Sequence, residues 1–187
     1  MRILLPFVIA VLALPAQTHA AQSVSVSPFR SVELRGGGDV EIVPGPVQRV
    51  ILLTGSTAFT SFTVEHGGKL RIDACNSRCP RNYPLHIRIE TPRMPDVAIR
   101  AGGKIVAGRS FAPMREISAA VSAGGTIDLR ALVADDVSAA VNAGGDIYVR
   151  PRLSLSAAVN AGGDIHYSGR PRVSMAVSNG GDVRREN

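Results

Sequence analysis

Tryptophan is absent from this chain of 187 residues, and Phe, Trp and Tyr together make up only 4% of it. With so few aromatic rings, the interior must be thin and filled mainly by Val, Ile, Leu and Ala. We expect no nucleic-acid partner for the same reason, because proteins that bind single strands stack the bases on aromatic side chains. Charged residues are also scarce, at 19%, although the formal net charge is +6.

Catalytic motifs are missing as well. Beyond the first twenty residues the histidines are His66, His86 and His166, and none belongs to a nucleophile motif, a metal triad or a phosphate-binding loop. We therefore expect no enzyme and no cofactor. A carbohydrate-active enzyme is the rival hypothesis, with Asp128 or a row of aspartates as its acids, because a pair of carboxylates suffices for glycoside hydrolysis.

Long apolar runs are limited to one, from Ile3 to Leu14, which is followed by Pro15 and by Ala20. This run is shorter than the roughly 20 residues that a membrane-spanning helix needs. It predicts a signal peptide at residues 1–20 and export of residues 21–187. We expect the product to be periplasmic, otherwise extracellular or on the cell surface, with no transmembrane span after cleavage.

Cysteine occurs only twice, as Cys75 and Cys79. In an oxidising compartment, two cysteines this close predict a disulfide that closes a small loop. Two free thiols on an exposed loop are the alternative. Structural zinc is less favoured, because it takes four ligands and no histidine is near in sequence.

Glycine, by contrast, is abundant and periodic. Double glycines recur at intervals of 22, 20, 18 and 18 residues, at positions 102–103, 124–125, 144–145, 162–163 and 180–181. A period near twenty is typical of a solenoid. Paired glycines in every unit argue against helices, at a cost of roughly 2 kcal/mol per unit relative to alanine, and they suit sharp bends with positive φ.

Apolar residues alternate with small polar ones before each glycine pair, which predicts strands with one face inward. We predict an all-β fold in which residues 96–187 form a single-stranded β-helix, right-handed by the general rule for crossovers. Equivalent residues of successive turns should then pair. Two inward rows follow: Ile99, Val121, Val141, Val159 and Val177, and Val97, Ala119, Ala139, Ala157 and Met175.

Residues 21–95 have a looser pattern. Candidate strands are 32–34, 39–43, 49–54, 61–65, 69–74 and 85–90. We expect an irregular segment with wider turns, or a sheet that covers the open end of the coil, because exposed strand edges promote aggregation. The charged "RREN" at the other end should protect that terminus. Together, residues 21–187 form one expected domain.

Three stretches resemble the head GIN domain family, the head of an auto-transporter adhesin. They are "FRSVELRGGGDVEIVPG" (29–45), "VEHGGKLRI" (64–72) and "LHIRIETPRMPDVAIRAGGKI" (85–105), followed by the glycine-rich units. Ala-Gly-Gly stands where the family more often has Ser-Gly-Ser-Gly. The resemblance implies a secreted, β-helix-like, all-β domain.

Outward rows of the predicted coil supply the candidate sites. The first is a flat face of small residues that suits a partner strand layer, a second copy or the N-terminal segment: Ala98, Ala120, Ala140, Ala158, Ala176, Ser122, Asn142, Asn160 and Ser178. A bare face whose small residues merely suit tight coils is the alternative.

Two charged rows are the other candidates. Asp146, Asp164 and Asp182 are a weak metal candidate, since each aspartate can instead accept hydrogen bonds from its own turn. A basic edge could hold an anionic polymer, or could only guard turns: Arg130, Arg150, Arg152, Arg170 and Arg172. His166, in a row with Tyr148 and Asp128, is expected at the solvated surface.

We therefore expect a non-catalytic envelope protein that binds or scaffolds through flat faces. An adhesin-like module that binds glycans or anionic envelope polymers is the alternative, and the carbohydrate-active enzyme comes third. Possible partners are a second copy, another envelope protein, a glycan or an anionic polymer.

Overall fold

The structure is a computed structural model that describes residues 21–76 and 78–186. The predicted signal peptide, residues 1–20, lies outside the described residues. Every regular element in these ranges is a β-strand, which confirms the all-β prediction. Within them there is accordingly no helix that could cross a membrane.

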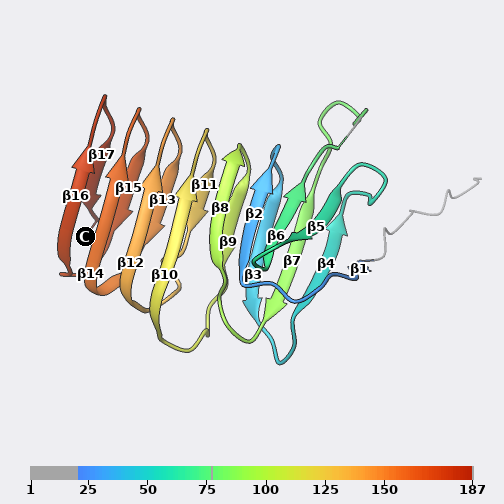
Figure 1. Ribbon diagram of the computed structural model, residues 1–187, viewed down its shortest axis with the longest axis horizontal. Helices are drawn as coiled ribbons and strands as arrows, with labels where there is room; N and C mark the ends of the chain where they lie inside the picture. Colours follow the sequence, from blue (N-terminus) through green and yellow to red (C-terminus); the bar gives the residue numbers. More distant parts are fainter. Residues whose placement is uncertain (1–20, 77, 187) are drawn as a thin grey trace, which may run out of the picture.

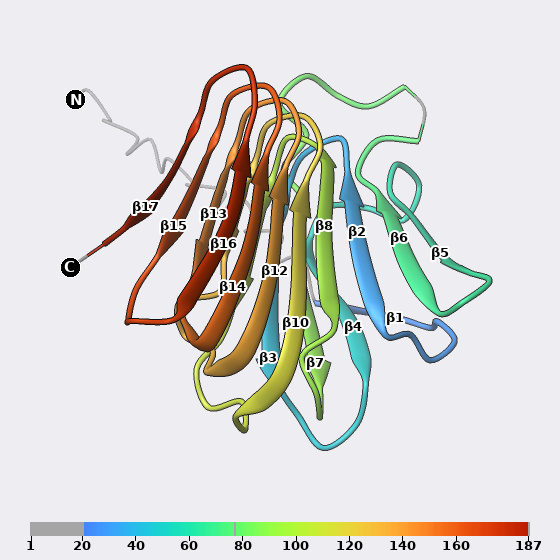
Figure 2. The ribbon, with the colours of Figure 1, turned by 60° about the vertical axis from the view of Figure 1, so that its left-hand side comes forward.

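The strands form two sheets that face each other and extend along the long axis of the molecule (Figures 1 and 2). In spatial order, the nine-stranded sheet contains β1 (Gln22–Val24), β4 (Arg49–Thr54), β7 (His86–Thr91), β3 (Asp39–Pro44), β9 (Lys104–Ala107), β11 (Thr126–Asp128), β13 (Asp146–Val149), β15 (Asp164–Tyr167) and β17 (Asp182–Arg185). The eight-stranded sheet contains β16 (Arg172–Val177), β14 (Pro151–Val159), β12 (Ala134–Val141), β10 (Met114–Val121), β8 (Asp96–Ala101), β2 (Ser31–Arg35), β6 (Lys69–Asp73) and β5 (Ser61–Glu65). The apolar core lies between the sheets and draws side chains from both.

From β8 onward the chain passes from one sheet to the other at every step, so each turn adds one parallel strand to each sheet. Both predicted inward rows are confirmed by the register: Val121 pairs with Ile99 and Val141, and Ala139 pairs with Ala119 and Ala157. The second row is filled by the single methyl groups of Ala119, Ala139 and Ala157, which are buried.

The glycine pairs mark the corners where the chain leaves the eight-stranded sheet, and they have positive φ. Gly144 and Gly145 have φ values of 75° and 101°, a region that residues with a Cβ rarely adopt. A Cβ on Gly145 would lie 2.7 Å from both the carbonyl oxygen of Gly125 and Cγ1 of Val121. On Gly144 it would meet no atom within 4 Å. The first glycine of the pair therefore supplies conformation only, whereas the second also permits close approach to the preceding turn.

The N-terminal region differs from the prediction in its sheet arrangement and in one additional strand. The candidate strands are present, but β2, β3, β6 and β7 extend the two sheets in parallel instead of forming a separate cover. β2 and β3 lie between the β6–β7 pair and the β8–β9 pair, so the spatial order departs from chain order. Antiparallel strands occur beyond them, where β1 pairs with β4, β4 with β7 and β5 with β6. The strand β1 was not predicted.

The opposite end of the molecule is open. Met175 and Val177 continue the inward rows on β16, yet 61% and 44% of their surface is exposed. The expectation that "RREN" protects this end is therefore wrong for its described residues. Arg184 and Glu186 instead contact the histidine of β15 on the outer face of the nine-stranded sheet.

Cys75 and Cys79 are joined by a disulfide, with an S–S distance of 2.02 Å. The predicted bridge is thus present. It closes the segment that follows β6, close to where Asn76 N–H donates to the Phe59 carbonyl. This loop lies at the N-terminal end of the molecule, away from the regular turns (Figure 1).

Candidate functional site

The small-residue face lies on the outer side of the eight-stranded sheet, where its predicted register is confirmed. Ala120 pairs with Ala98 and Ala140, and Ala158 pairs with Ala140 and Ala176. Ala140, Ala158 and Ala176 are exposed, so no described segment of the chain covers them. Beside them the Asn160 side-chain amide donates to Oδ1 of Asn142 at 2.9 Å. This hydrogen bond links β12 and β14 at their ends, beside the row of exposed alanines.

A different arrangement occupies the outer face of the nine-stranded sheet. Strand register places Asp128, Tyr148, His166 and Arg184 in one row. Arg130 lies over the Tyr148 ring with Cζ 4.7 Å from the ring centroid. Tyr148 stacks on His166 with a centroid distance of 4.3 Å and an interplanar angle of 10°. Cationic and aromatic groups therefore form one continuous stack across successive strands.

The prediction of a solvated His166 is wrong. Its side chain is only 3% exposed, because Tyr148 covers one side of the ring and the Arg184 and Glu186 side chains approach Nδ1. Nδ1 is 3.2 Å from Nε of Arg184 and 3.1 Å from Oε1 of Glu186. The alternation of the strand correctly placed the residue on the outer face, but gave no sign of the C-terminal residues that cover it.

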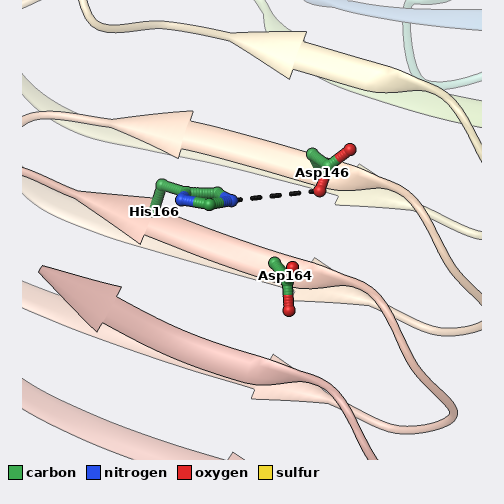
Figure 3. Close-up of side chains that lie close together, drawn as sticks. All are labelled: Asp146, Asp164 and His166. Carbon is green, nitrogen blue, oxygen red and sulfur yellow. Dashed lines mark ion pairs between the residues drawn. The ribbon is translucent and has the colours of Figure 1, made fainter. Parts of the chain in front are cut away.

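The aspartate row is present, with Asp164 paired to both Asp146 and Asp182. The set of residues that could bind a metal ion differs from the predicted set. Asp146, Asp164 and His166 each offer a ligand atom within 4.8 Å of the others (Figure 3). Asp182 is exposed and its Oδ1 accepts from the N–H of Val183. Its predicted place in the set is taken by His166, while its own carboxylate makes the local hydrogen bond expected of a turn residue.

Asp128 and Arg130 form a two-point ion pair at the end of β11. Nε of Arg130 donates to Oδ1 at 3.0 Å and Nη2 to Oδ2 at 2.5 Å. Burial alone raises the pKa of Asp128, but the hydrogen bonds and charge of Arg130 outweigh it and hold that pKa below its ordinary value. The paired, ionised carboxylate is unsuited to act as a general acid, which weakens the role of Asp128 in the enzyme hypothesis.

The arginines of the predicted basic edge have different surroundings in the structure. All five arginines lie at or beside the corner where the chain passes from the nine-stranded to the eight-stranded sheet. Arg130 and Arg150 line one cavity of about 790 Å³ there, together with Arg109. Arg152 instead pairs with Asp135 at 3.2 Å, and Arg172 is exposed on β16.

Arg109 was missed because it lies outside the regular part of the repeat, in the irregular segment after β9. The cavity also contains the acidic groups Glu41 and Asp128. Glu41 is paired with Arg88 at 3.0 Å and Asp128 with Arg130. Among the described residues, neither Arg109 nor Arg150 has an ion-pair partner, so these two cations are available at the groove.

Residues 113–171 match the family described as "Putative auto-transporter adhesin, head GIN domain". Similar solved structures include a "putative adhesin" from Bacteroides fragilis NCTC 9343, at 17% identity and a TM-score of 0.43, covering 92% of this chain and 99% of that one. A "putative lipid binding protein" from Parabacteroides distasonis ATCC 8503 gives 14% identity and a TM-score of 0.38, with 89% and 96% covered. No curated protein matches the chain. The family that the sequence resembles is therefore the one whose model matches residues 113–171.

Proposed function

We propose that this chain is an exported, non-catalytic, adhesin-like module of the cell envelope that binds anionic polymers at the corner groove of Arg109, Arg130 and Arg150. The observation that carries the proposal is the cavity of about 790 Å³ that these three arginines line. The adhesin description of the family matched by residues 113–171 supports a role in binding at the cell surface or in the envelope.

The proposal includes a finer description of the fold. Residues 96–187 wind as a single-stranded, right-handed β-helix with one strand per sheet in each turn, within one domain that spans residues 21–187. The parallel registers and the alternation between sheets support this winding. Successive turns of such a coil are about 4.8 Å apart. Arginines that follow β9, β11 and β13 then come to one corner, although they are some twenty residues apart in sequence.

The groove suits an extended polyanion. Guanidinium groups bind carboxylates and phosphates through two parallel hydrogen bonds. Arg109 and Arg150 are exposed, and Arg130 is held in place by Asp128 and Tyr148. Two free cations flanking a fixed one can contact acidic groups along a polymer chain. Binding should therefore depend on charge and weaken with added salt.

The test measures binding of lipopolysaccharide, a wall teichoic acid, a polyuronate and neutral dextran to the wild-type protein. We expect saturable binding to an acidic polymer and none to dextran. The double variant Arg109→Gln/Arg150→Gln should lose at least tenfold in affinity, whereas Arg115→Gln, an exposed arginine outside the groove, should bind as wild type. Equal binding by the double variant would contradict the proposal, and release of reducing sugar would favour the carbohydrate-active enzyme.

The exposed small-residue face supports a second candidate function, contact with a protein layer such as another copy of this chain. Its support is that Ala140, Ala158 and Ala176 are uncovered on a sheet whose neighbouring strands carry dense ion pairs. Contiguous exposed apolar patches commonly mark contact surfaces, and the alanine row is the apolar part of this face. A charge introduced at Ala140 tests this candidate, as described below.

A further inference from the structure

The outer face of the nine-stranded sheet brings together a mixed set of metal-binding side chains. Asp146 on β13 and Asp164 on β15 are register partners, and His166 follows two residues after Asp164 on the same face. The three ligand atoms lie within 4.8 Å of one another. Figure 3 shows the His166 ring directed toward the Asp146 carboxylate, with Asp164 beside it.

The His166 ring is held in a way that suits a metal ligand. It is 3% exposed, stacked on Tyr148, and its Nδ1 lies 3.1 Å from Oε1 of Glu186. Nε of Arg184 donates to Nδ1 at 3.2 Å; an Nδ1–H directed to Glu186 instead would leave the lone pair on Nε2, on the side of the two aspartates. A carboxylate that fixes the tautomer and the orientation of a ligating histidine is the common outer shell of metal sites.

Neither aspartate lies close enough to Nε2 of His166 to form a hydrogen bond with it. The nearest carboxylate oxygen, Oδ1 of Asp146, is 3.9 Å away, beyond hydrogen-bonding distance. Nε2 has no hydrogen-bond partner among the described residues, and it is not fully buried, because no buried side-chain nitrogen or oxygen of those residues lacks a partner. Arg184 offers the competing arrangement, because its Nε is 3.2 Å from Nδ1 and its Nη2 is 4.0 Å from Oδ2 of Asp164. In that arrangement Nε2 carries the hydrogen and has no acceptor within reach, so metal binding requires the proton to move to Nδ1 and be donated to Glu186.

We propose that Asp146, Asp164 and His166 bind one divalent transition-metal ion of the Zn²⁺ type, with Glu186 as the positioning residue of His166. One imidazole nitrogen and two carboxylate oxygens form a ligand set that zinc accepts, with water in the fourth position. Ligand atoms around tetrahedral zinc are about 3.3 Å apart, given bond lengths near 2.0–2.1 Å. Rotation of the two half-buried aspartates closes the present separation, and the ion offsets their mutual repulsion.

The ion would join β13 to β15 near the open end of the molecule. The N-terminal end has antiparallel strands and a disulfide, whereas the C-terminal end has exposed core residues. An ion that binds the folded chain and not the unfolded one raises stability by mass action. The site would therefore stabilise the end of the fold at which core residues are exposed to solvent.

The test is a titration of the metal-free, full-length exported protein with Zn²⁺, followed by calorimetry and thermal unfolding. We expect one site per chain and an unfolding temperature that rises with Zn²⁺, with no comparable effect of Ca²⁺ or Mg²⁺. Co²⁺ should give the visible absorption bands of a tetrahedral site. Stoichiometric binding of Ca²⁺ in place of Zn²⁺ would overturn the proposal, because it would show that the imidazole is not a ligand.

Variants separate this site from adventitious binding. Asp146→Asn and His166→Gln should each lower Zn²⁺ affinity at least 100-fold, and Glu186→Gln should lower it about tenfold to 100-fold without removing the site. His66→Gln and Asp182→Asn, which change an exposed histidine and the neighbouring aspartate, should bind as wild type. The stacked His166 ring also supports the fold, so Asp146→Asn, which keeps that stack, is the decisive variant. Wild-type affinity in Asp146→Asn would contradict the proposal.

Discussion

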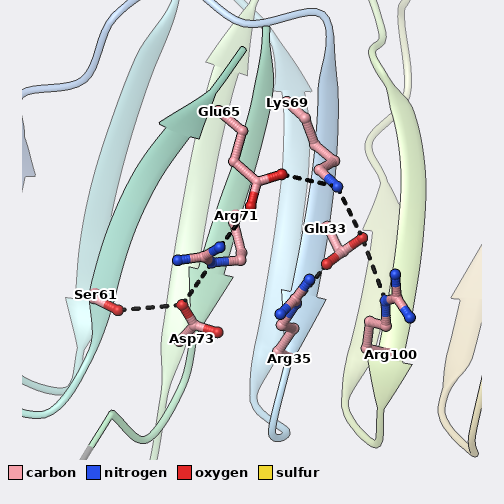
Figure 4. A network of polar contacts seen from close by, with 8 residues as sticks. All are labelled: Glu33, Arg35, Ser61, Glu65, Lys69, Arg71, Asp73 and Arg100. Carbon is pink, nitrogen blue, oxygen red and sulfur yellow. Dashed lines mark hydrogen bonds and ion pairs between the residues drawn. The ribbon is translucent and has the colours of Figure 1, made fainter. Parts of the chain in front are cut away.

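The two halves of the eight-stranded sheet have opposite outer surfaces on the same kind of backbone. On β5, β6, β2 and β8 the outer side chains form a continuous network of charges (Figure 4). On β10, β12, β14 and β16 the equivalent positions carry Ala and Ser. The first half pairs its charged groups with one another, whereas the second has small uncharged side chains at the equivalent positions and carries charges, including Glu116, Asp136 and Arg172, near the starts of its strands. The same backbone repeat therefore presents a charged surface in one half and a surface of small side chains in the other.

Glu33 is the centre of the charged half. Its side chain is 7% exposed and lies within reach of three cations: Arg35, Lys69 at 3.5 Å and Arg100 at 3.6 Å. Burial raises the pKa of this carboxyl, but the hydrogen bond from Arg35 and the charges of all three cations outweigh burial and lower it. The negative charge of Glu33 is therefore balanced by three cations within the same surface.

The two halves also differ in the side chains that fill the interior. One inward row of the eight-stranded sheet changes from Leu70 and Val32 to Ala119 and Ala139. Other inward positions of the regular half keep large side chains such as Ile127. The regular half also depends on close backbone approach at the glycine corners. The N-terminal half depends more on packing and ion pairs.

The largest expected effect on the free energy of unfolding comes from a substitution at one glycine corner of the regular half. Gly145→Ala should cost about 3 kcal/mol or more, because left-handed strain of roughly 1–2 kcal/mol adds to overlap with the preceding turn. Gly144→Ala carries the strain alone and should cost about 1–2 kcal/mol. Gly67→Ala, in the open β5–β6 turn, should resemble Gly144→Ala. Urea unfolding measures all three, and equal losses at Gly144 and Gly145 would contradict the role of close approach.

A smaller effect is expected in the charged half. Glu33→Gln leaves three cations around a neutral group and should lower the free energy of unfolding by about 2 kcal/mol at pH 7. Glu116→Gln, at an exposed position on β10, should change it by less than about 0.5 kcal/mol. If the two variants lost the same stability, the network of Figure 4 would contribute nothing particular to the fold.

The contribution of Glu33 should also depend on pH. Because its pKa in the folded state is below the ordinary value of 4.5, folding favours the ionised form. This stabilisation is complete above the unfolded pKa and is lost as pH falls through the lower folded pKa. The difference in stability between wild type and Glu33→Gln should therefore shrink below about pH 4. A difference that stays constant from pH 7 to pH 3 would show that charge plays no part.

The smallest effect on folding, and the sharpest on association, is expected at the small-residue face. Ala140→Arg should change the free energy of unfolding by less than about 0.5 kcal/mol. If this face joins copies of the chain, the variant should sediment as a smaller species than wild type. Thr63→Arg, on the outer face of β5 in the charged half, should leave sedimentation unchanged. Identical sedimentation of wild type and Ala140→Arg would reject self-association through this face.

The sequence was most informative where the pattern repeats. Alternation and the glycine spacing predicted the rows of Val121 and Ala139, and the weaker pattern before residue 96 located every strand there except β1. Spatial order was not predictable there, because nothing in β2 or β6 indicates that the β2–β3 pair lies between later pairs. His166 and Arg109 were missed for a related reason. Their surroundings come from non-repeating segments, the C-terminal residues and the loop after β9.

The winding of the chain is tested most directly by cysteine pairs on neighbouring turns. Ala140 and Ala158 are register partners on adjacent parallel strands, which places their Cα atoms about 4.8 Å apart, within disulfide range. Ala140→Cys/Ala158→Cys should form an intramolecular disulfide under mild oxidation, detected by mass spectrometry of the monomer. Ala140→Cys/Ala176→Cys, two turns apart, should not. Bridging of the second pair and not the first would contradict the proposed coil.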